Sequence, residues 1–299
     1  MAPVLTAEQL QQWEDDGYLV LEGFFSPAET TEMLDRVHKL LNEFDLEGHP
    51  LTTFRTDEDK EGHIGDEYFL GSGDKIRYFL EPSAVSRATP TTPASLVVPR
   101  ERSVNKIGHA LAVLDPVFHK YTFEDPRIKQ VAQDMGKKDP RVLQSMVICK
   151  QPKIGGSVPC HNDSTFLYTD PPTAVGCWIA LEACTPENGC LSFLPGSHKK
   201  VRISSRFVRA SAGGTTFETV PGVEPNEEKW DELDGWKEAP VGPGALVLIH
   251  GSVMHRSPPN PSTKTRMIYT FHMIEGGAEY DAKNWLQPTS EMPFQRLYA

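Results

Sequence analysis

From about residue 141 onward, the chain is dominated by short apolar segments separated by tight turns. Seven such segments have the length and composition of β-strands: 142–150, 158–168, 174–183, 190–194, 245–249, 253–257 and 266–273. Glycine, proline and asparagine gather between them, as at Asn188-Gly189 and Pro243-Gly244. Many short strands at close spacing predict a mainly β fold with flanking helices, in which antiparallel strands form a jelly-roll sandwich or barrel.

The first 140 residues carry helix signals instead. Thr6-Ala7-Glu8-Gln9 and Ser26-Pro27-Ala28-Glu29 both have the spacing of a capping box and predict helices that start there. A third helix is expected after Asp125-Pro126. Short strands are expected at 18–21, 74–79 and 104–109. We therefore expect one domain over residues 1–299, in which residues 1–140 are helix-rich and pack on the barrel and residues 141–299 form most of its core.

Three stretches have polar, proline-rich or serine-rich composition and predict loops or inserts: 45–66, 82–103 and 199–240. The net charge of −11 argues against a nucleic-acid partner, because phosphate backbones need a basic surface. No apolar run approaches the roughly 20 residues of a membrane span. The five cysteines are odd in number and form no C-x-x-C, so we expect reduced thiols. With no signal pattern and no terminal S-K-L, a cytoplasmic location is expected.

His161 and Asp163 form an H-x-D pair, and none of the other histidines begins an H-x-D or H-x-E. Residues two apart on an extended segment point to the same side, so the imidazole and the carboxylate should converge. Such a pair suits a borderline metal such as Fe(II). Cys160 lies beside the pair, but neighbours on a strand face opposite ways, so we expect its thiol to point away.

A third ligand is available at His255, which lies 255 − 163 = 92 residues beyond Asp163. Two histidines and one carboxylate would complete a facial triad that leaves metal positions open. In a jelly roll, strands distant in sequence can lie side by side, so this separation is no obstacle. His250 is the rival, but its place in the turn His250-Gly251 makes it the weaker choice.

Arg266 follows His255 by 266 − 255 = 11 residues and begins an alternating apolar strand. A buried arginine needs an anionic partner, and its planar fork fits a carboxylate. A structural pair with an Asp or Glu is the alternative. Beside a metal triad, however, Arg266 points to a dicarboxylate that chelates the metal.

These residues resemble the phytanoyl-CoA dioxygenase family of Fe(II)/2-oxoglutarate-dependent oxygenases. The resemblance rests on segment 16–23, His161-x-Asp163, segments 188–191 and 195–198, and the order Gly251, His255, Arg266. It extends over nearly the whole chain. Segments 73–77, 105–110, 144–146 and 284–289 narrow it to one branch of the family.

The resemblance implies a double-stranded β-helix with a cupin-like jelly roll, in which His161, Asp163 and His255 hold Fe(II). It also implies that Arg266 binds the distal carboxylate of 2-oxoglutarate, with O₂ as second cosubstrate and ascorbate as a possible reductant. Family positions that line the cosubstrate pocket match Lys106, Met146 and Trp178. From the residues alone, Lys106 fits a structural ion pair equally well, and the other two read as core residues.

Thr265 precedes Arg266 and could donate its hydroxyl to the same carboxylate. Residues 199–209 carry five cations without an acid, a local basic patch that would suit an anionic small-molecule substrate, although a solvated surface explains it equally. Three functions stay open: an oxygenase that hydroxylates an unidentified substrate, a sensor or scaffold that binds metal and 2-oxoglutarate, and a cupin-type enzyme with Zn or Mn and no 2-oxoglutarate.

Overall fold

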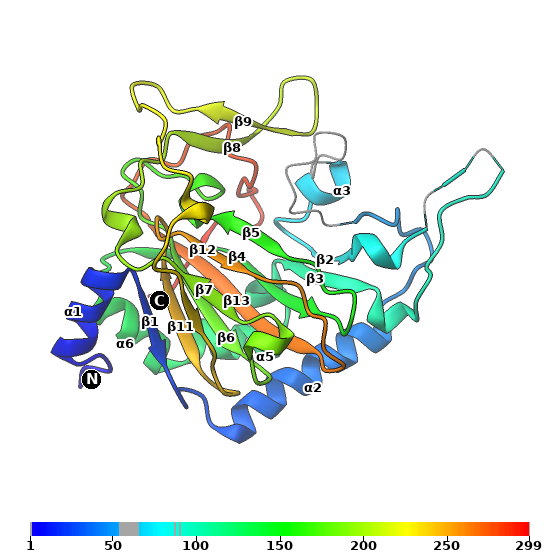
Figure 1. Cartoon of the computed structure of the whole chain (residues 1–299), viewed down its shortest axis with the longest axis horizontal. Helices are drawn as coiled ribbons and strands as arrows, with labels where there is room; N and C mark the ends of the chain where they lie inside the picture. The colour runs from blue at the N-terminus through cyan, green and yellow to red at the C-terminus, as the bar shows by residue number, and fades with distance from the viewer. Residues whose placement is uncertain (1, 54–65, 87, 90, 299) are drawn as a thin grey trace.

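The computed structural model describes residues 2–53, 66–86, 88–89 and 91–298. Within these residues, two β-sheets lie face to face and form the body of the molecule (Figure 1). The larger sheet has eight strands in the order β1-β11-β6-β13-β4-β3-β2, and β14 pairs with β4 beside this path. The smaller sheet has four strands in the order β10-β7-β12-β5. All strand pairs in both sheets are antiparallel.

The larger sheet contains β1 (Tyr18–Leu21), β11 (Leu246–His250), β6 (Val175–Ala180), β13 (Arg266–Glu275), β4 (Pro140–Lys150), β3 (Val104–His109), β2 (Ile76–Leu80) and β14 (Gln295–Arg296). The smaller sheet contains β10 (Lys237–Ala239), β7 (Leu191–Phe193), β12 (His255–Ser257) and β5 (Val158–His161). A separate hairpin joins β8 (Ser205–Arg209) to β9 (Thr215–Thr219). Two facing antiparallel sheets confirm the predicted double-stranded β-helix.

β13 lies at the centre of the larger sheet, and its side chains alternate between two environments. Tyr269 and Phe271 belong to the apolar core shared with the helices, whereas Ile268 packs with Phe193 of the smaller sheet. Because strand side chains alternate with period two, Arg266, Thr270 and His272 must share the inward face with Ile268. The alternation of this one strand therefore decides which polar groups enter the space between the sheets.

The longer helices begin where their capping residues predict. Thr6 and Ser26 form capping boxes at the starts of α1 (Ala7–Asp16) and α2 (Pro27–Glu43), and Gly17 ends α1 in the left-handed conformation. Asp125 caps α6 (Pro126–Asp134). The remaining helical turns are α3 (Glu67–Leu70), α4 (Leu111–Leu114), α5 (Pro116–His119) and the π-turn η3 (Lys120–Glu124), with 3-10 turns η1 (Pro82–Ala84), η2 (Arg100–Arg102), η4 (Asp163–Thr165), η5 (Pro186–Asn188), η6 (Ser197–Lys199) and η7 (Trp230–Glu232).

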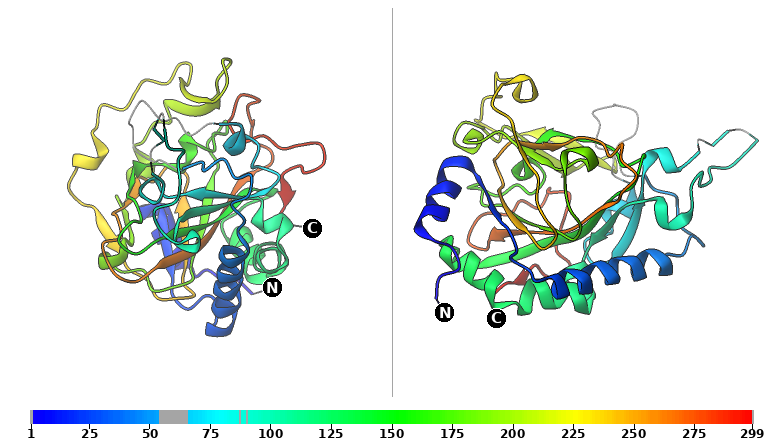
Figure 2. Two further views of the ribbon diagram at one scale, coloured as in Figure 1. Left: turned by 90° about the vertical axis from the view of Figure 1, so that its right-hand side faces the viewer. Right: turned by 60° about the horizontal axis from the view of Figure 1, so that its bottom comes forward.

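α2, α4, α5 and α6 cover the face of the larger sheet that is turned away from the smaller one (Figure 2). Met33 and Val37 of α2 are fully buried in the same apolar cluster as Phe118 and Tyr269. Burying large apolar side chains of this kind contributes about 1.5–3 kcal/mol each. The helical layer therefore supports the larger sheet from behind and leaves its other face to the smaller sheet.

Two regions differ from the sequence expectation. The predicted insert 199–240 contains the β8–β9 hairpin and the edge strand β10, so it is partly built into the fold. The helical turns between 111 and 124 were not predicted, because each is too short for a period of 3.6 residues to show. The predicted loop at 45–66 falls largely on residues 54–65, which lie outside the described residues, as do 87 and 90 of the loop at 82–103.

In the part of the chain that the structure describes, no helix combines the length and apolar character needed to cross a membrane.

Candidate metal centre

His161 and Asp163 lie where β5 ends and a 3-10 turn begins. His161 is the last residue of β5, and Asp163 is the first residue of η4. The predicted strand over 158–168 is therefore too long. It stops because the Asn162 side chain accepts a hydrogen bond from the Thr165 backbone and caps the turn. Asn162 itself is still extended, so both predicted ligand side chains point to one side.

His255 begins β12 and lies directly opposite His161 in the register of the smaller sheet. The Nε2 atoms of the two imidazoles are each 3.7 Å from Oδ1 of Asp163. One ligand atom from each of the three residues lies within 4.8 Å of the others. The structure thus brings the three predicted ligands together across a separation of 92 residues.

Backbone carbonyls fix the orientation of both imidazoles. Nδ1 of His161 is 2.8 Å from the Pro159 oxygen, and Nδ1 of His255 is 3.1 Å from the Val253 oxygen. A carbonyl only accepts, so each Nδ1 carries a proton, and in the neutral ring that a metal binds Nε2 presents a lone pair. Two lone pairs directed at one carboxylate oxygen repel it unless a cation lies between them. Metal bonds of about 2.1 Å can span up to about 4.2 Å, so the 3.7 Å separations fit a shared ion.

The electrostatics favour the protonation states that a metal needs. Desolvation and the neighbouring His255 imidazole together lower the pKa of His161 to about 4, so His161 is neutral near pH 7. Burial alone would raise the pKa of Asp163, but the neighbouring His255 and His272 hold it well below its usual range. Asp163 is therefore ionised.

The two rivals considered from the sequence lie elsewhere. Among the described residues, the three-ligand group includes neither Cys160 nor His250. Burial and the nearby Asp231 raise the pKa of the Cys160 thiol to about 12, which keeps it from acting as a thiolate. The His250 ring packs instead against Trp13, with ring centroids 5.6 Å apart.

The cosubstrate residues suggested by family resemblance share the inward face of the larger sheet. Met146 of β4 and Trp178 of β6 lie opposite Thr270 of β13 on either side, which places the three in one cross-strand row. Lys106 of β3 lies opposite Ile148, two residues along β4 from Met146. Burial lowers the pKa of Lys106 to about 7. These side chains form one wall of the space between the sheets.

Arg266 lies on the same face and is 2 % exposed. Its guanidinium donates to the Gly189 oxygen at 3.2 Å and lies 5.6 Å from the centre of the Trp178 ring. Among the described residues no carboxylate oxygen lies within 4 Å of it, and its Nε has no hydrogen-bond partner. Burying an unpaired cation is costly. The alternative of a structural ion pair with an Asp or Glu therefore finds no support among the described residues.

Thr265 does not join Arg266. Its hydroxyl donates to Oε1 of Glu182 at 2.7 Å, and both residues line a wide groove beside α2 that Arg266 does not line. The expectation that Thr265 shares a carboxylate with Arg266 is wrong, because adjacent residues at the start of a strand point to opposite faces.

Much of the basic stretch 199–209 is engaged within the chain. Lys199 pairs with Asp15 at 3.0 Å, and Arg206 pairs with both Glu218 and Asp281. These pairs favour the interpretation as ordinary surface over a dedicated anion site. An anionic substrate stays a prediction.

His272 is a polar neighbour that the sequence reasoning missed. Its Nε2 lies 3.4 Å from Oδ2 of Asp163. The signal was present, since His272 follows Arg266 by an even number of residues on an alternating strand and therefore shares its face.

The accessible side of the centre is aromatic. The His161 side chain is 22 % exposed, against 12 % for Asp163 and 6 % for His255. The Phe166 ring lies 5.9 Å from His161, and its next aromatic neighbours are Phe207 and Phe217 of the β8–β9 hairpin. The centre is thus reached past an apolar rim.

Comparison with known proteins agrees with this geometry at the level of the fold. A crystal structure of EctD from S. alaskensis, described with 2-oxoglutarate and 5-hydroxyectoine, superimposes with a TM-score of 0.61 at 19% identity, covering 94% of this chain and 79% of that one. The carbocyclase SnoK from nogalamycin biosynthesis, described as non-heme and alpha-ketoglutarate dependent, gives 0.61 at 18% identity, covering 98% and 99%. The chain therefore has the fold of these two proteins.

Other relatives share a much higher sequence identity with this chain. Phytanoyl-CoA dioxygenase domain-containing protein 1 of Rattus norvegicus is 44% identical over 98% of this chain and 99% of its own length. Its homolog in Caenorhabditis elegans is 42% identical, covering 96% and 98%. The predicted similarity to one branch of the family is thus confirmed. The model of the family described as Phytanoyl-CoA dioxygenase (PhyH) matches residues 13–268. The chain belongs to the phytanoyl-CoA dioxygenase family.

Proposed function

We propose that this chain is an Fe(II)- and 2-oxoglutarate-dependent dioxygenase, formed by a single domain over residues 1–299. It would couple the oxidative decarboxylation of 2-oxoglutarate, to succinate and CO₂, with hydroxylation of a small-molecule substrate. One observation carries the proposal: two imidazoles and one carboxylate converge on a point, and a buried guanidinium without a carboxylate partner among the described residues lies on the same inner wall.

His161, Asp163 and His255 would hold the metal, and the Pro159 and Val253 carbonyls would keep the imidazole lone pairs turned toward it. When bound, the ferrous ion supplies the activation of O₂ that the side chains cannot perform. Three protein ligands leave open positions for the cosubstrates.

Arg266 would bind the distal carboxylate of 2-oxoglutarate with its planar fork. Lys106, Met146 and Trp178 would line the same pocket, the first supplying positive charge and the others an apolar wall that excludes water. The rim around Phe166 would meet the substrate on its way to the centre.

The test is release of labelled CO₂ from 1-labelled 2-oxoglutarate by purified protein with Fe(II) and ascorbate. His255→Ala should abolish release because it removes a metal ligand. His250→Ala is the matched control: it removes the histidine at the end of β11, the strand that precedes β12 in the chain, and should leave CO₂ release unchanged. Full activity of His255→Ala would refute the ligand assignment.

A sensor or scaffold function is the second candidate, and the buried, complete constellation would serve it too. Substrate-stimulated succinate formation separates the two, since a sensor has no substrate to hydroxylate. A visible charge-transfer band, formed when 2-oxoglutarate is added anaerobically to the Fe(II) protein, separates both from a Zn or Mn cupin without 2-oxoglutarate.

A further inference from the structure

The two oxygens of the Asp163 carboxylate face different groups. Oδ1 lies 3.7 Å from Nε2 of both His161 and His255, which makes it the oxygen on the metal side. Oδ2 lies 3.4 Å from Nε2 of His272 and has no hydrogen-bond partner among the described residues. Leaving a buried carboxylate oxygen without a donor is costly. His272 is therefore the group placed to satisfy it.

The larger sheet holds His272 in place beside Asp163. It is 8 % exposed and lies opposite Gln144 of β4 and Gly176 of β6. The three-ligand group within 4.8 Å does not include His272, so its place is beside the carboxylate and not among the metal ligands.

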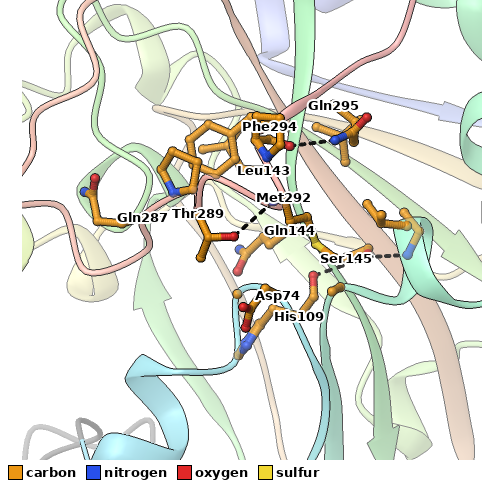
Figure 3. Close-up of a pocket in the computed structure, with 17 residues that line it drawn as sticks. Asp74, His109, Leu143, Gln144, Ser145, Gln287, Thr289, Met292, Phe294 and Gln295 are labelled. Atoms are coloured by element: carbon orange, nitrogen blue, oxygen red, sulfur yellow. Dashed lines mark hydrogen bonds between the residues drawn. The ribbon is translucent and has the colours of Figure 1, made fainter.

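Gln144 lies beside the other ring nitrogen of His272, with its Nε2 3.4 Å from Nδ1. The ionised Asp163 carboxylate only accepts, so a hydrogen bond to it needs the ring proton on Nε2. Nδ1 is then free to accept from the Gln144 amide. Gln144 also lines a cavity of about 20 Å³ with Asp74, His109 and Thr289 (Figure 3). That space holds little more than one water.

Gly176 leaves the room for this contact. A Cβ at this position would lie 3.3 Å from Nε2 of His272 and 3.4 Å from Oδ2 of Asp163. The imidazole and the carboxylate meet over a residue without a side chain. Any larger residue would crowd both groups.

We propose that His272 is a positioning residue for the metal centre: its Nε2–H binds Oδ2 of Asp163, so that the carboxylate offers only Oδ1 to the ion. The inference rests on the proposed metal centre. Partners of this kind orient metal-binding carboxylates and imidazoles, and their loss typically weakens metal affinity 10- to 100-fold.

The test is a titration of metal-free protein with Co(II), followed through its visible d–d bands. His272→Leu should weaken Co(II) affinity about 10- to 100-fold and change the band shape, because both Asp163 oxygens become available to the ion. His272→Gln keeps an N–H donor and should recover most of the affinity. The matched control is His109→Leu, which removes another buried histidine of the same sheet and should bind Co(II) like the wild type.

Wild-type affinity and band shape in His272→Leu would overturn the role of His272 and leave the metal centre standing. Equal losses in His109→Leu would also overturn it. No Co(II) binding by the wild type would overturn the metal centre and this inference together.

A measurement on the wild type needs no variant. In Zn(II)-loaded protein with ¹⁵N-labelled histidine, NMR should find His272 protonated on Nε2 and the ligands His161 and His255 protonated on Nδ1. A neutral His272 ring with its proton on Nδ1 would overturn the proposal.

Discussion

Arg266→Met separates a ligand-binding arginine from a structural one, because the first role predicts little change in stability and the second predicts a loss. A structural ion pair broken in the interior costs about 3–5 kcal/mol. Arg266, however, has no carboxylate within 4 Å among the described residues. Its replacement by an apolar side chain of similar length relieves a desolvation penalty of several kcal/mol.

The contacts that Arg266→Met removes contribute little to stability. The contact with the Trp178 ring at 5.6 Å contributes about 0.5–2 kcal/mol. The Gly189 oxygen is not orphaned by the substitution, because Ser257 Oγ also donates to it, at 2.8 Å. We therefore expect the metal-free and 2-oxoglutarate-free variant to unfold within about 2 kcal/mol of the wild type.

The affinity for 2-oxoglutarate, by contrast, should fall strongly. Losing a buried charge pair of about 3–5 kcal/mol at 1.4 kcal/mol per tenfold raises the Kd from roughly 10²-fold to roughly 4 × 10³-fold. The two measurements are guanidinium unfolding of the metal-free protein, followed by tryptophan fluorescence, and anaerobic calorimetry of 2-oxoglutarate binding to the Co(II)-loaded protein.

The control is Arg127→Met. Arg127 pairs with Glu29 at 2.6 Å and Asp125 at 2.5 Å, so this variant should lose stability and keep its affinity for 2-oxoglutarate. A loss of 3 kcal/mol or more in metal-free Arg266→Met, or wild-type affinity for 2-oxoglutarate, would refute the reasoning.

Two further predictions concern neighbouring side chains. Burial lowers the pKa of Lys106 to about 7, so its ammonium loses a proton as the pH rises through neutrality. The affinity for the 2-oxoglutarate dianion should therefore fall between pH 6 and 8. Calorimetry of Lys106→Met should find that this pH-dependent loss of affinity is missing. A slope that persists unchanged in the variant would exclude Lys106 from the pocket. Thr265→Val loses the hydrogen bond to Glu182 and should lower the free energy of unfolding by about 1 kcal/mol, while the Kd for 2-oxoglutarate stays the same. A higher Kd would show that Thr265 does contribute to 2-oxoglutarate binding.

Periodicity and capping predicted much of the fold because each acts over a few residues. The helix starts at Thr6 and Ser26 needed only their own hydrogen-bonding groups. The β8–β9 hairpin was missed because its polar residues reflect a position outside the two main sheets.

At the site, the sequence predicted which residues carry the chemistry but not how they are oriented. Thr265 was placed by adjacency, whereas the strand turns it away from Arg266. His272 was overlooked because nothing local links it to Asp163, from which it is separated by 272 − 163 = 109 residues. The first error is local, because alternation along one strand already turns Thr265 away from Arg266. The second concerns two separate strands, whose contact only the arrangement of the sheets decides.

The direct pairing of His161 with His255 ties together two points that are 255 − 161 = 94 residues apart. An ion held by both, together with Asp163, would act as a removable cross-link of the folded chain, because the three ligands meet only in the fold and the binding free energy adds to stability. β5 is an edge strand of the smaller sheet and has β12 as its neighbour. Under the proposed metal centre, the supply of the ion would therefore set how firmly this edge strand stays attached.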